Sequence, residues 1–182
     1  SHRHPGLPIV SPRWLHDGSG VIVQINTQVD GRQTSAFHFV DVRTGTFRRL
    51  FDRDTNGRAR TGVGTVSPDD KTLYLGVRNN PGGPITGIVG VDLATGVERP
   101  VLTLPGTGIA GGIGLAVSPD GSTLAVMALV APAPVTGTQG AFFGPGGEAR
   151  IFTVGVDGSS YREVYGPCAN GAGSLIADKM RW

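Results

Sequence analysis

The sequence has little of what many small domains rely on for stability or chemistry. A single cysteine, Cys168, among 182 residues excludes an internal disulfide framework and a zinc site built from cysteines. No apolar run approaches the roughly 18 residues that a membrane-spanning helix needs, so we expect no membrane span. The 16 basic residues exceed the 14 acidic ones by a formal charge of only +2, which argues against a nucleic-acid partner.

Glycine and proline, in contrast, are abundant. The 30 glycines and 13 prolines make up close to a quarter of the chain, a share near that of disordered proteins. A hydrophobic content of 38% argues against disorder and for a core. Because the glycines are scattered between short apolar runs, the composition predicts many short strands and many turns.

A turn motif recurs at an interval of about fifty residues, which points to an internal repeat. Each copy precedes an apolar run, and an Asp-x-x-Thr-Gly signature follows at 41–45 and 92–96, with a looser form at 157–158. The anchor positions 14, 66, 117 and 182 lie 52, 51 and 65 residues apart, the last interval being lengthened by an insertion at 130–148. The three full copies are Trp14-Leu15-His16-Asp17-Gly18, Val66-Ser67-Pro68-Asp69-Asp70 and Val117-Ser118-Pro119-Asp120-Gly121.

The segments between these turns are short enough to be strands. In Pro-Asp-Gly the proline presets φ, the aspartate bonds the nearby backbone and the glycine adopts a positive φ, so the motif ends one strand and begins another. The apolar runs have no persistent helical period, and each copy therefore provides four strands. The expected strands are 9–14, 21–26, 37–42 and 47–51, then 64–66, 73–77, 88–92 and 97–102, then 113–117, 124–129, 150–154 and 161–165.

A four-stranded meander repeated at this period is typical of an all-β propeller blade. We expect blades at 9–63, 64–111 and 112–173, with 174–182 beginning the next blade. A β-sandwich gives no reason for a fixed repeat. Trp14 and Trp182 are expected to wedge between adjacent blades, so that Trp14→Ala would cost about 3–5 kcal/mol.

The motifs resemble those of TolB-type, WD40-like propeller repeats, and the resemblance extends from about residue 9 to residue 182. It implies a six- or seven-bladed propeller, of which three blades and the opening strand of a fourth are present, so we expect the chain to be a piece of a longer protein. It also implies a bacterial protein in the periplasm or outside the cell. Similar repeats precede the hydrolase domain of prolyl-oligopeptidase-like peptidases.

The two ends of the sheets differ in sequence character. Consecutive loops of an antiparallel meander fall at opposite ends, so the short turn motifs share one end. Variable segments occupy the other end, where binding residues are usually found. These segments are 27–36, 52–63, 79–86, 105–112, 130–148 and 166–179.

Two groups of side chains at this variable end are candidates for binding. Five arginines suit an anionic ligand or an acidic partner, or else form a solvated rim balanced by Asp30, Asp52 and Asp54. Two phenylalanines in the insertion contact a partner or fold back on the blade. The candidates are Arg32, Arg53, Arg58, Arg60, Arg78, Phe142 and Phe143.

A calcium site is a further candidate. Asp52, Asp54 and Asn56 alternate, with Gly57 at the sixth position, as in the first half of a calcium-binding loop. The twelfth position, however, is Val63 where a glutamate is needed. The alternative is a polar turn formed by residues that favour turns.

No catalytic motif is present, since Gly-x-Ser-x-Gly is missing and the four histidines form no metal-spaced pair. The sequence predicts a non-catalytic scaffold that binds a protein partner or small ligand through its variable-loop face. One alternative is the propeller domain of a prolyl-oligopeptidase-like serine hydrolase whose catalytic domain lies outside this chain. Another is a propeller lyase or lactonase with a metal in its channel. Because three blades close no ring, we expect the remaining blades or a second copy to cover the open flanks.

Overall fold

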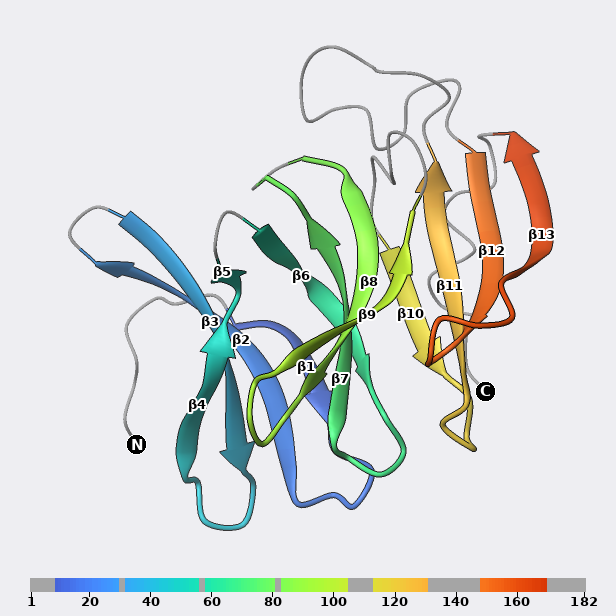
Figure 1. The fold of residues 1–182 in the computed structure, drawn as a ribbon. Helices are drawn as coiled ribbons and strands as arrows, with labels where there is room; N and C mark the ends of the chain where they lie inside the picture. Colours follow the sequence, from blue (N-terminus) through green and yellow to red (C-terminus); the bar gives the residue numbers. More distant parts are fainter. Residues whose placement is uncertain are drawn as a thin grey trace.

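The computed structural model describes residues 9–29, 32–55, 58–80, 83–104, 113–130 and 148–169, and these residues form three antiparallel sheets (Figure 1). Sheet 1 is a four-stranded meander in which each strand pairs with the next along the chain. Its strands are β1 (Ile9–Trp14), β2 (Gly20–Val29), β3 (Arg32–Asp41) and β4 (Phe47–Asp52).

Sheets 2 and 3 repeat this meander, and sheet 2 carries a two-residue strand, β5, beyond its innermost long strand β6. Sheet 2 consists of β5 (Asp54–Thr55), β6 (Arg58–Val66), β7 (Thr72–Arg78), β8 (Ile85–Asp92) and β9 (Glu98–Thr103). Sheet 3 consists of β10 (Ile113–Val117), β11 (Thr123–Val130), β12 (Glu148–Gly155) and β13 (Arg162–Ala169).

The sheets stand side by side, and the first long strand of each contacts that of its neighbour, β1 with β6 and β6 with β10. Every one of the twelve predicted strands overlaps an observed strand. This arrangement confirms the prediction of an all-β fold that forms part of a propeller.

Two segments predicted as loops are strands. The 27–36 segment continues β2 and β3 as a long hairpin, in which Thr27 pairs with Thr34 and their hydroxyl oxygens lie 2.6 Å apart. Much of the 52–63 segment is the β5–β6 hairpin. The loop prediction failed because polar side chains do not prevent the backbone from continuing its hydrogen-bond ladder, and cross-strand threonine pairs stabilise it.

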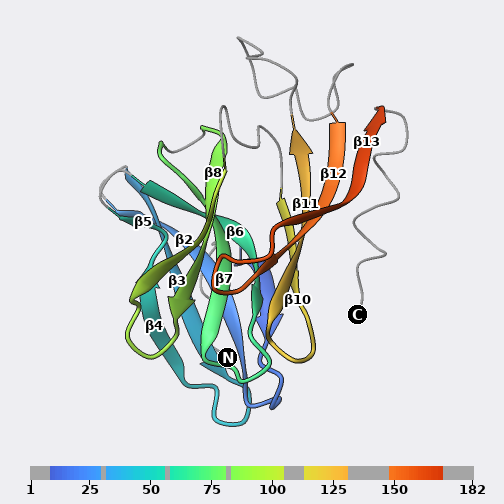
Figure 2. The ribbon, with the colours of Figure 1, turned by 45° about the vertical axis from the view of Figure 1, so that its right-hand side comes forward.

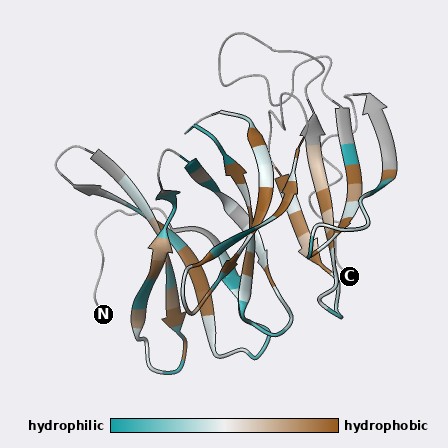
Figure 3. Ribbon diagram, viewed as in Figure 1, coloured by the Kyte–Doolittle hydropathy of each residue, from teal (hydrophilic) through white to brown (hydrophobic). Residues whose placement is uncertain are grey.

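The apolar core lies between the sheets and forms two clusters. Along β7, Leu73 and Leu75 belong to the cluster shared with sheet 1, whereas Tyr74 belongs to the cluster shared with sheet 3. Successive residues of a strand point to opposite faces, so the middle sheet is covered on both. Figure 3 shows hydrophobic positions along the strands and hydrophilic ones at the turns.

Trp14 departs from its prediction. Its equivalents Val66 and Val117 are 3% and 9% exposed, but Trp14 is 62% exposed. Val66 contributes to the core with sheet 1, and Val117 to the core with sheet 2. Trp14 therefore lies on the face of sheet 1 that points away from sheet 2, where no described residue forms a covering sheet. The predicted burial of Trp14 is wrong for this chain, and so is the large cost of truncating it; Trp182 lies outside the described residues.

Among the residues that the structure describes, none forms a helix long and apolar enough to cross a membrane.

Candidate binding site

The two ends of the sheets differ in structure as well as in sequence. The turns that join β1 to β2, β3 to β4, β6 to β7, β8 to β9, β10 to β11 and β12 to β13 share the lower end in Figures 1 and 2. Positive φ angles, which glycine tolerates without strain, also occur at these turns. The glycines that adopt them are Gly18, Gly45, Gly96, Gly121 and Gly158.

Polar side chains at this lower end hold the turns in shape. The Asp41 carboxylate accepts hydrogen bonds from the backbone N–H groups of Arg43 and Thr44 at 2.9 and 2.8 Å. Asp92 accepts from the backbone of Thr95 at 2.7 Å and from its hydroxyl at 2.8 Å. Hydrogen bonds from these threonines lower the pKa of both carboxyls. These carboxylates are therefore engaged in turn structure.

At the opposite, variable end, Arg60 anchors a polar cluster between sheets 1 and 2. Its side chain is only 9% exposed, and its Nε and Nη2 both lie 3.0 Å from Oε2 of Glu98. Its guanidinium carbon lies 5.3 Å from the ring centroid of Phe51 on β4. A guanidinium buried this far needs its carboxylate, so Arg60 is a structural residue of the interface.

Arg58 and Arg53 extend this cluster towards solvent. Arg58 donates from Nη1 to Oε1 of Glu98 at 2.9 Å, and its side chain is 49% exposed. Arg53 donates from Nε to the backbone carbonyl of Arg60 at 3.0 Å and lies 3.6 Å from the carboxylate of Asp54. Glu98 thus serves two arginines at once, one buried and one exposed.

Arg78, at the end of β7, has a different partner. It donates to the backbone carbonyl of Gly83, and none of the described carboxylates forms an ion pair with it. Burial, together with the positive charge of Arg53, lowers the pKa of Arg78. Among the described ion pairs of this cluster, Glu98 pairs with Arg58 and Arg60, and Asp54 lies near Arg53. The described part of the cluster carries an excess of two positive charges.

A pocket of about 330 Å³ opens beside Arg58 at the upper end of sheet 2. Its polar lining includes Asn79 and Thr86, whose hydroxyl donates to the Asn79 side-chain oxygen at 3.2 Å. Leu102 and Leu104 add apolar groups, but more of the exposed lining is polar than apolar. Polar groups placed beside apolar side chains in a concave site can orient a small ligand. The lining residues are Arg58, Val77, Asn79, Thr86, Gly87, Ile88, Val89, Pro100, Leu102, Thr103 and Leu104.

The structure thus brings four of the predicted arginines together at sheet 2. Arg32 begins β3 at the tip of the long hairpin, away from this cluster along the chain. Phe142, Phe143 and Asn56 lie outside the described residues. Glu98, the carboxylate that pairs with Arg58 and Arg60, was missed because the sequence suggested Asp30, Asp52 and Asp54 as their counter-charges.

The two described aspartates of the predicted calcium site each have an arginine nearby. Asp52 ends β4 and pairs with Arg49, whereas Asp54 belongs to β5 and lies near Arg53. Within the described ranges, no group of three or more His, Cys, Asp or Glu side chains is placed to hold a metal ion. The calcium site stays a prediction from the sequence.

His16 and Asp70 form an acid–imidazole pair at the lower end, with Nδ1 of the histidine 2.9 Å from Oδ1 of the aspartate. Such a pair also occurs in catalytic triads, which need in addition a hydroxyl or thiol on the other ring nitrogen. In the described part of the chain no hydroxyl or thiol bonds to His16. Asp70 also accepts from the backbone N–H groups of His16 and Asp17, so it links two turns of adjacent sheets.

Comparison with known proteins supports the fold at the level of structure. No protein-family model matches the sequence, and no curated protein matches it either. A putative TolB from Agrobacterium tumefaciens superposes with a TM-score of 0.58 at 17% identity, covering 88% of this chain and 50% of that one. An oligogalacturonate lyase from Vibrio parahaemolyticus gives 0.59 at 16% identity, covering 88% and 42%. An acylaminoacyl peptidase from Pyrococcus horikoshii gives 0.62 at 13% identity, covering 89% and 26%.

These likenesses confirm a TolB-like propeller fold. The chain spans half or less of the length of each matched structure. The matched structures include TolB proteins and enzymes alike, so they assign a fold and leave the activity to be argued from the site.

Proposed function

We propose that this chain is a non-catalytic propeller scaffold that binds a carboxylate-bearing partner or small ligand at the variable end of sheet 2. The observation that carries the proposal is the exposed Arg58 on the wall of a pocket of about 330 Å³, because it belongs to a cluster whose described members carry an excess of two positive charges. A TolB-like scaffold of this kind would act in the periplasm or outside the cell.

Arg58 is the residue best suited to the ligand. One of its nitrogens donates to Glu98, which leaves further N–H donors of an exposed guanidinium at the pocket wall. Arginine recognises carboxylates with two parallel hydrogen bonds, and such charged bonds are stronger than neutral ones. Asn79 and Thr86 add neutral polar groups, while the partly buried Leu102 adds an apolar side chain.

Two carboxylate-bearing probes suit the chemistry of the site, one a peptide and the other a sugar. A hexaglutamate peptide represents an acidic segment of a protein partner. Trigalacturonate represents the anionic sugars named in the matched oligogalacturonate lyase. Affinities would be measured by isothermal titration calorimetry at low salt, because exposed charges are screened at high salt.

Arg58→Gln should weaken binding of the better probe about 10- to 100-fold, the loss expected for a charged hydrogen bond. The matched control is Arg48→Gln, since Arg48 is an exposed arginine on β4 that lies over Phe39, outside the pocket. Equal losses in the two variants, or no binding by the unmodified chain, would count against the site. Release of an unsaturated sugar from trigalacturonate would contradict a non-catalytic role.

A second candidate is the propeller domain of a serine hydrolase, which the likeness to acylaminoacyl peptidase favours. In that case the sequence that follows this chain in its gene should encode a Gly-x-Ser-x-Gly motif within an α/β pattern. Reading that sequence distinguishes the two candidates directly.

A further inference from the structure

The strand registers show which residues occupy equivalent positions in the three sheets. Trp14 pairs with Val21 in sheet 1, as Val66 pairs with Leu73 in sheet 2 and Val117 with Leu124 in sheet 3. On the third strand, Val21 pairs with Val40, as Leu73 does with Val91 and Leu124 with Val154. The same face of each sheet is therefore built from corresponding residues.

In sheets 2 and 3 this face is covered by the preceding sheet. Leu73 and Leu124 are 1% and 0% exposed within the two inter-sheet cores. In sheet 1 the corresponding face has no described neighbour. Trp14 is 62% exposed there, and Phe47, which pairs with Val40, is 49% exposed. An apolar face of this kind marks an interaction surface.

The outer face of sheet 3 is the matching counterpart. On this face, β11 and β12 form the pairs Ala125–Thr153 and Met127–Ile151. The equivalent pairs in sheet 1, between β2 and β3, are Ile22–Phe39 and Gln24–Phe37. In sheet 1, Ile22 and Phe37 of this set pack in the core with sheet 2. In sheet 3, Met127 and Ile151 are only partly buried, and no described sheet covers them.

The side chains on these two outer faces compensate each other in size. In the interface between sheets 1 and 2, a valine at position 66 and an isoleucine at position 22 share one core. On the outer faces the corresponding residues are Trp14, which is 62% exposed, and the small Ala125, which is 5% exposed. A larger residue on one face thus meets a smaller one on the other, as volume-conserving packing requires.

We propose that two copies of this chain associate through these faces, with sheet 3 of each copy packed on sheet 1 of the other. Each contact repeats the sheet-on-sheet packing seen twice within the chain. Because each copy contributes one face of each kind, two contacts related by a two-fold axis close a ring of six sheets.

Analytical ultracentrifugation of the whole 182-residue chain at micromolar concentration should show a dimer. Trp14→Asp and Met127→Asp should each raise the dimer dissociation constant more than 100-fold, because each places a charge in both contacts. The control is Val97→Asp, since Val97 is 65% exposed in the turn between β8 and β9, away from both faces. It should remain a dimer. A monomeric unmodified chain or an open series of larger oligomers would overturn the proposal.

A mixing experiment ties the two faces to each other. In an equimolar mixture of the Trp14→Asp and Met127→Asp variants, one of the two contacts is intact, so heterodimers should form although each variant alone is monomeric. A mixture that stays monomeric, with both variants showing the cooperative unfolding of the Val97→Asp control, would overturn the pairing. If an aspartate variant fails to fold, Trp14→Ala and Met127→Ala replace the pair, and each should weaken the dimer at least tenfold.

Discussion

The interface between sheets 1 and 2 differs from that between sheets 2 and 3 in its polar content. Both contain an apolar cluster of similar construction. The first also has polar connections between the two sheets: Arg60 donates to the Asp52 carbonyl, Asp70 accepts from the His16 and Asp17 backbone, and Arg13 donates to the Gly64 carbonyl. These directional hydrogen bonds fix the position of sheet 1 relative to sheet 2, whereas apolar contacts are non-directional.

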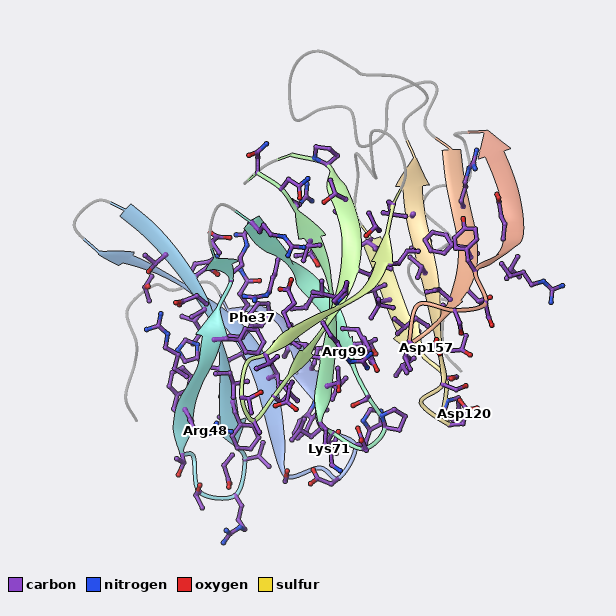
Figure 4. The ribbon with its side chains drawn as sticks, in the orientation of Figure 1. Phe37, Arg48, Lys71, Arg99, Asp120 and Asp157 are labelled. Atoms are coloured by element: carbon purple, nitrogen blue, oxygen red, sulfur yellow. The ribbon has the colours of Figure 1, made fainter. Side chains whose placement is uncertain are left out.

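In the second interface a long polar side chain, Arg99, lies between sheets 2 and 3 (Figure 4). Its Nη1 donates to the backbone carbonyl of Val156 at 2.8 Å, and its guanidinium carbon lies 6.0 Å from the Tyr74 ring centroid. The position of Asp70 in the second turn is taken by Gly121 in the third, which packs beside Pro68. Equivalent apolar positions on the strands therefore produce the sheet stacking that both interfaces share. The ionisable side chains make the stability of the first interface depend on charge.

The largest expected effect tests what the two interfaces share. Leu73→Ala and Leu124→Ala remove equivalent, fully buried side chains, and each should lower the free energy of unfolding by about 2–5 kcal/mol. Urea denaturation followed by circular dichroism measures both. A near-neutral result at either position would show that the two cores are not equivalent.

The next effect tests what distinguishes the interfaces. Glu98→Gln removes the carboxylate charge that pairs with the buried Arg60 guanidinium and should cost about 3 kcal/mol. Arg99→Met, the nearest counterpart in the second interface, should cost less than about 1.5 kcal/mol, because it removes an exposed hydrogen bond to a carbonyl. The comparison fails if Arg99→Met proves the more damaging change in the same denaturation assay.

The smallest effect concerns Asp70. Asp70→Asn should cost about 1–2 kcal/mol at neutral pH, because the amide retains one acceptor oxygen for the bonds that the carboxylate makes with two. Asparagine also tolerates the positive φ of 58° at this position, so backbone strain is not added.

The pH dependence of this effect follows from the direction of the pKa shift. Burial by itself raises the pKa of Asp70, but hydrogen bonds from His16 and Asp17 outweigh it and the pKa is lowered. The stabilisation is therefore fully present above the unfolded value of about 3.9 and is lost as the pH falls through the lower folded value. The stability difference from Asp70→Asn should shrink below about pH 4. A difference that grows on acidification would contradict this, and the same comparison in a His16→Gln background removes the imidazole contribution.

The sequence predicted the strands well because their limits are set by local turn chemistry. Pro-Asp-Gly and Asp-x-x-Thr-Gly specify a turn wherever they occur, and apolar runs lie between them. The long β2–β3 hairpin was missed because its polar residues carry no apolar alternation. Trp14 was placed at the correct repeat position, but its exposure depends on which sheets surround it, and no local pattern contains that information.

The candidate site was predictable only in part. Clustering of basic residues at the variable end follows from the meander, and the structure places four arginines there. Their counter-charge Glu98 lies 38 residues from Arg60, and Asp70 lies 54 residues from His16. Such pairs arise from how sheets stack, which single-sequence patterns do not specify. Binding by these arginines stays a prediction.

The most direct test of the account is a nuclear Overhauser measurement on methyl-labelled protein. If the sheets stack through equivalent faces, Val66 methyl protons should show contacts to side chains of sheet 1, and Val117 methyl protons should show corresponding contacts to side chains of sheet 2. Contacts from Val66 and Val117 to unrelated strands, or to no neighbouring sheet, would contradict it.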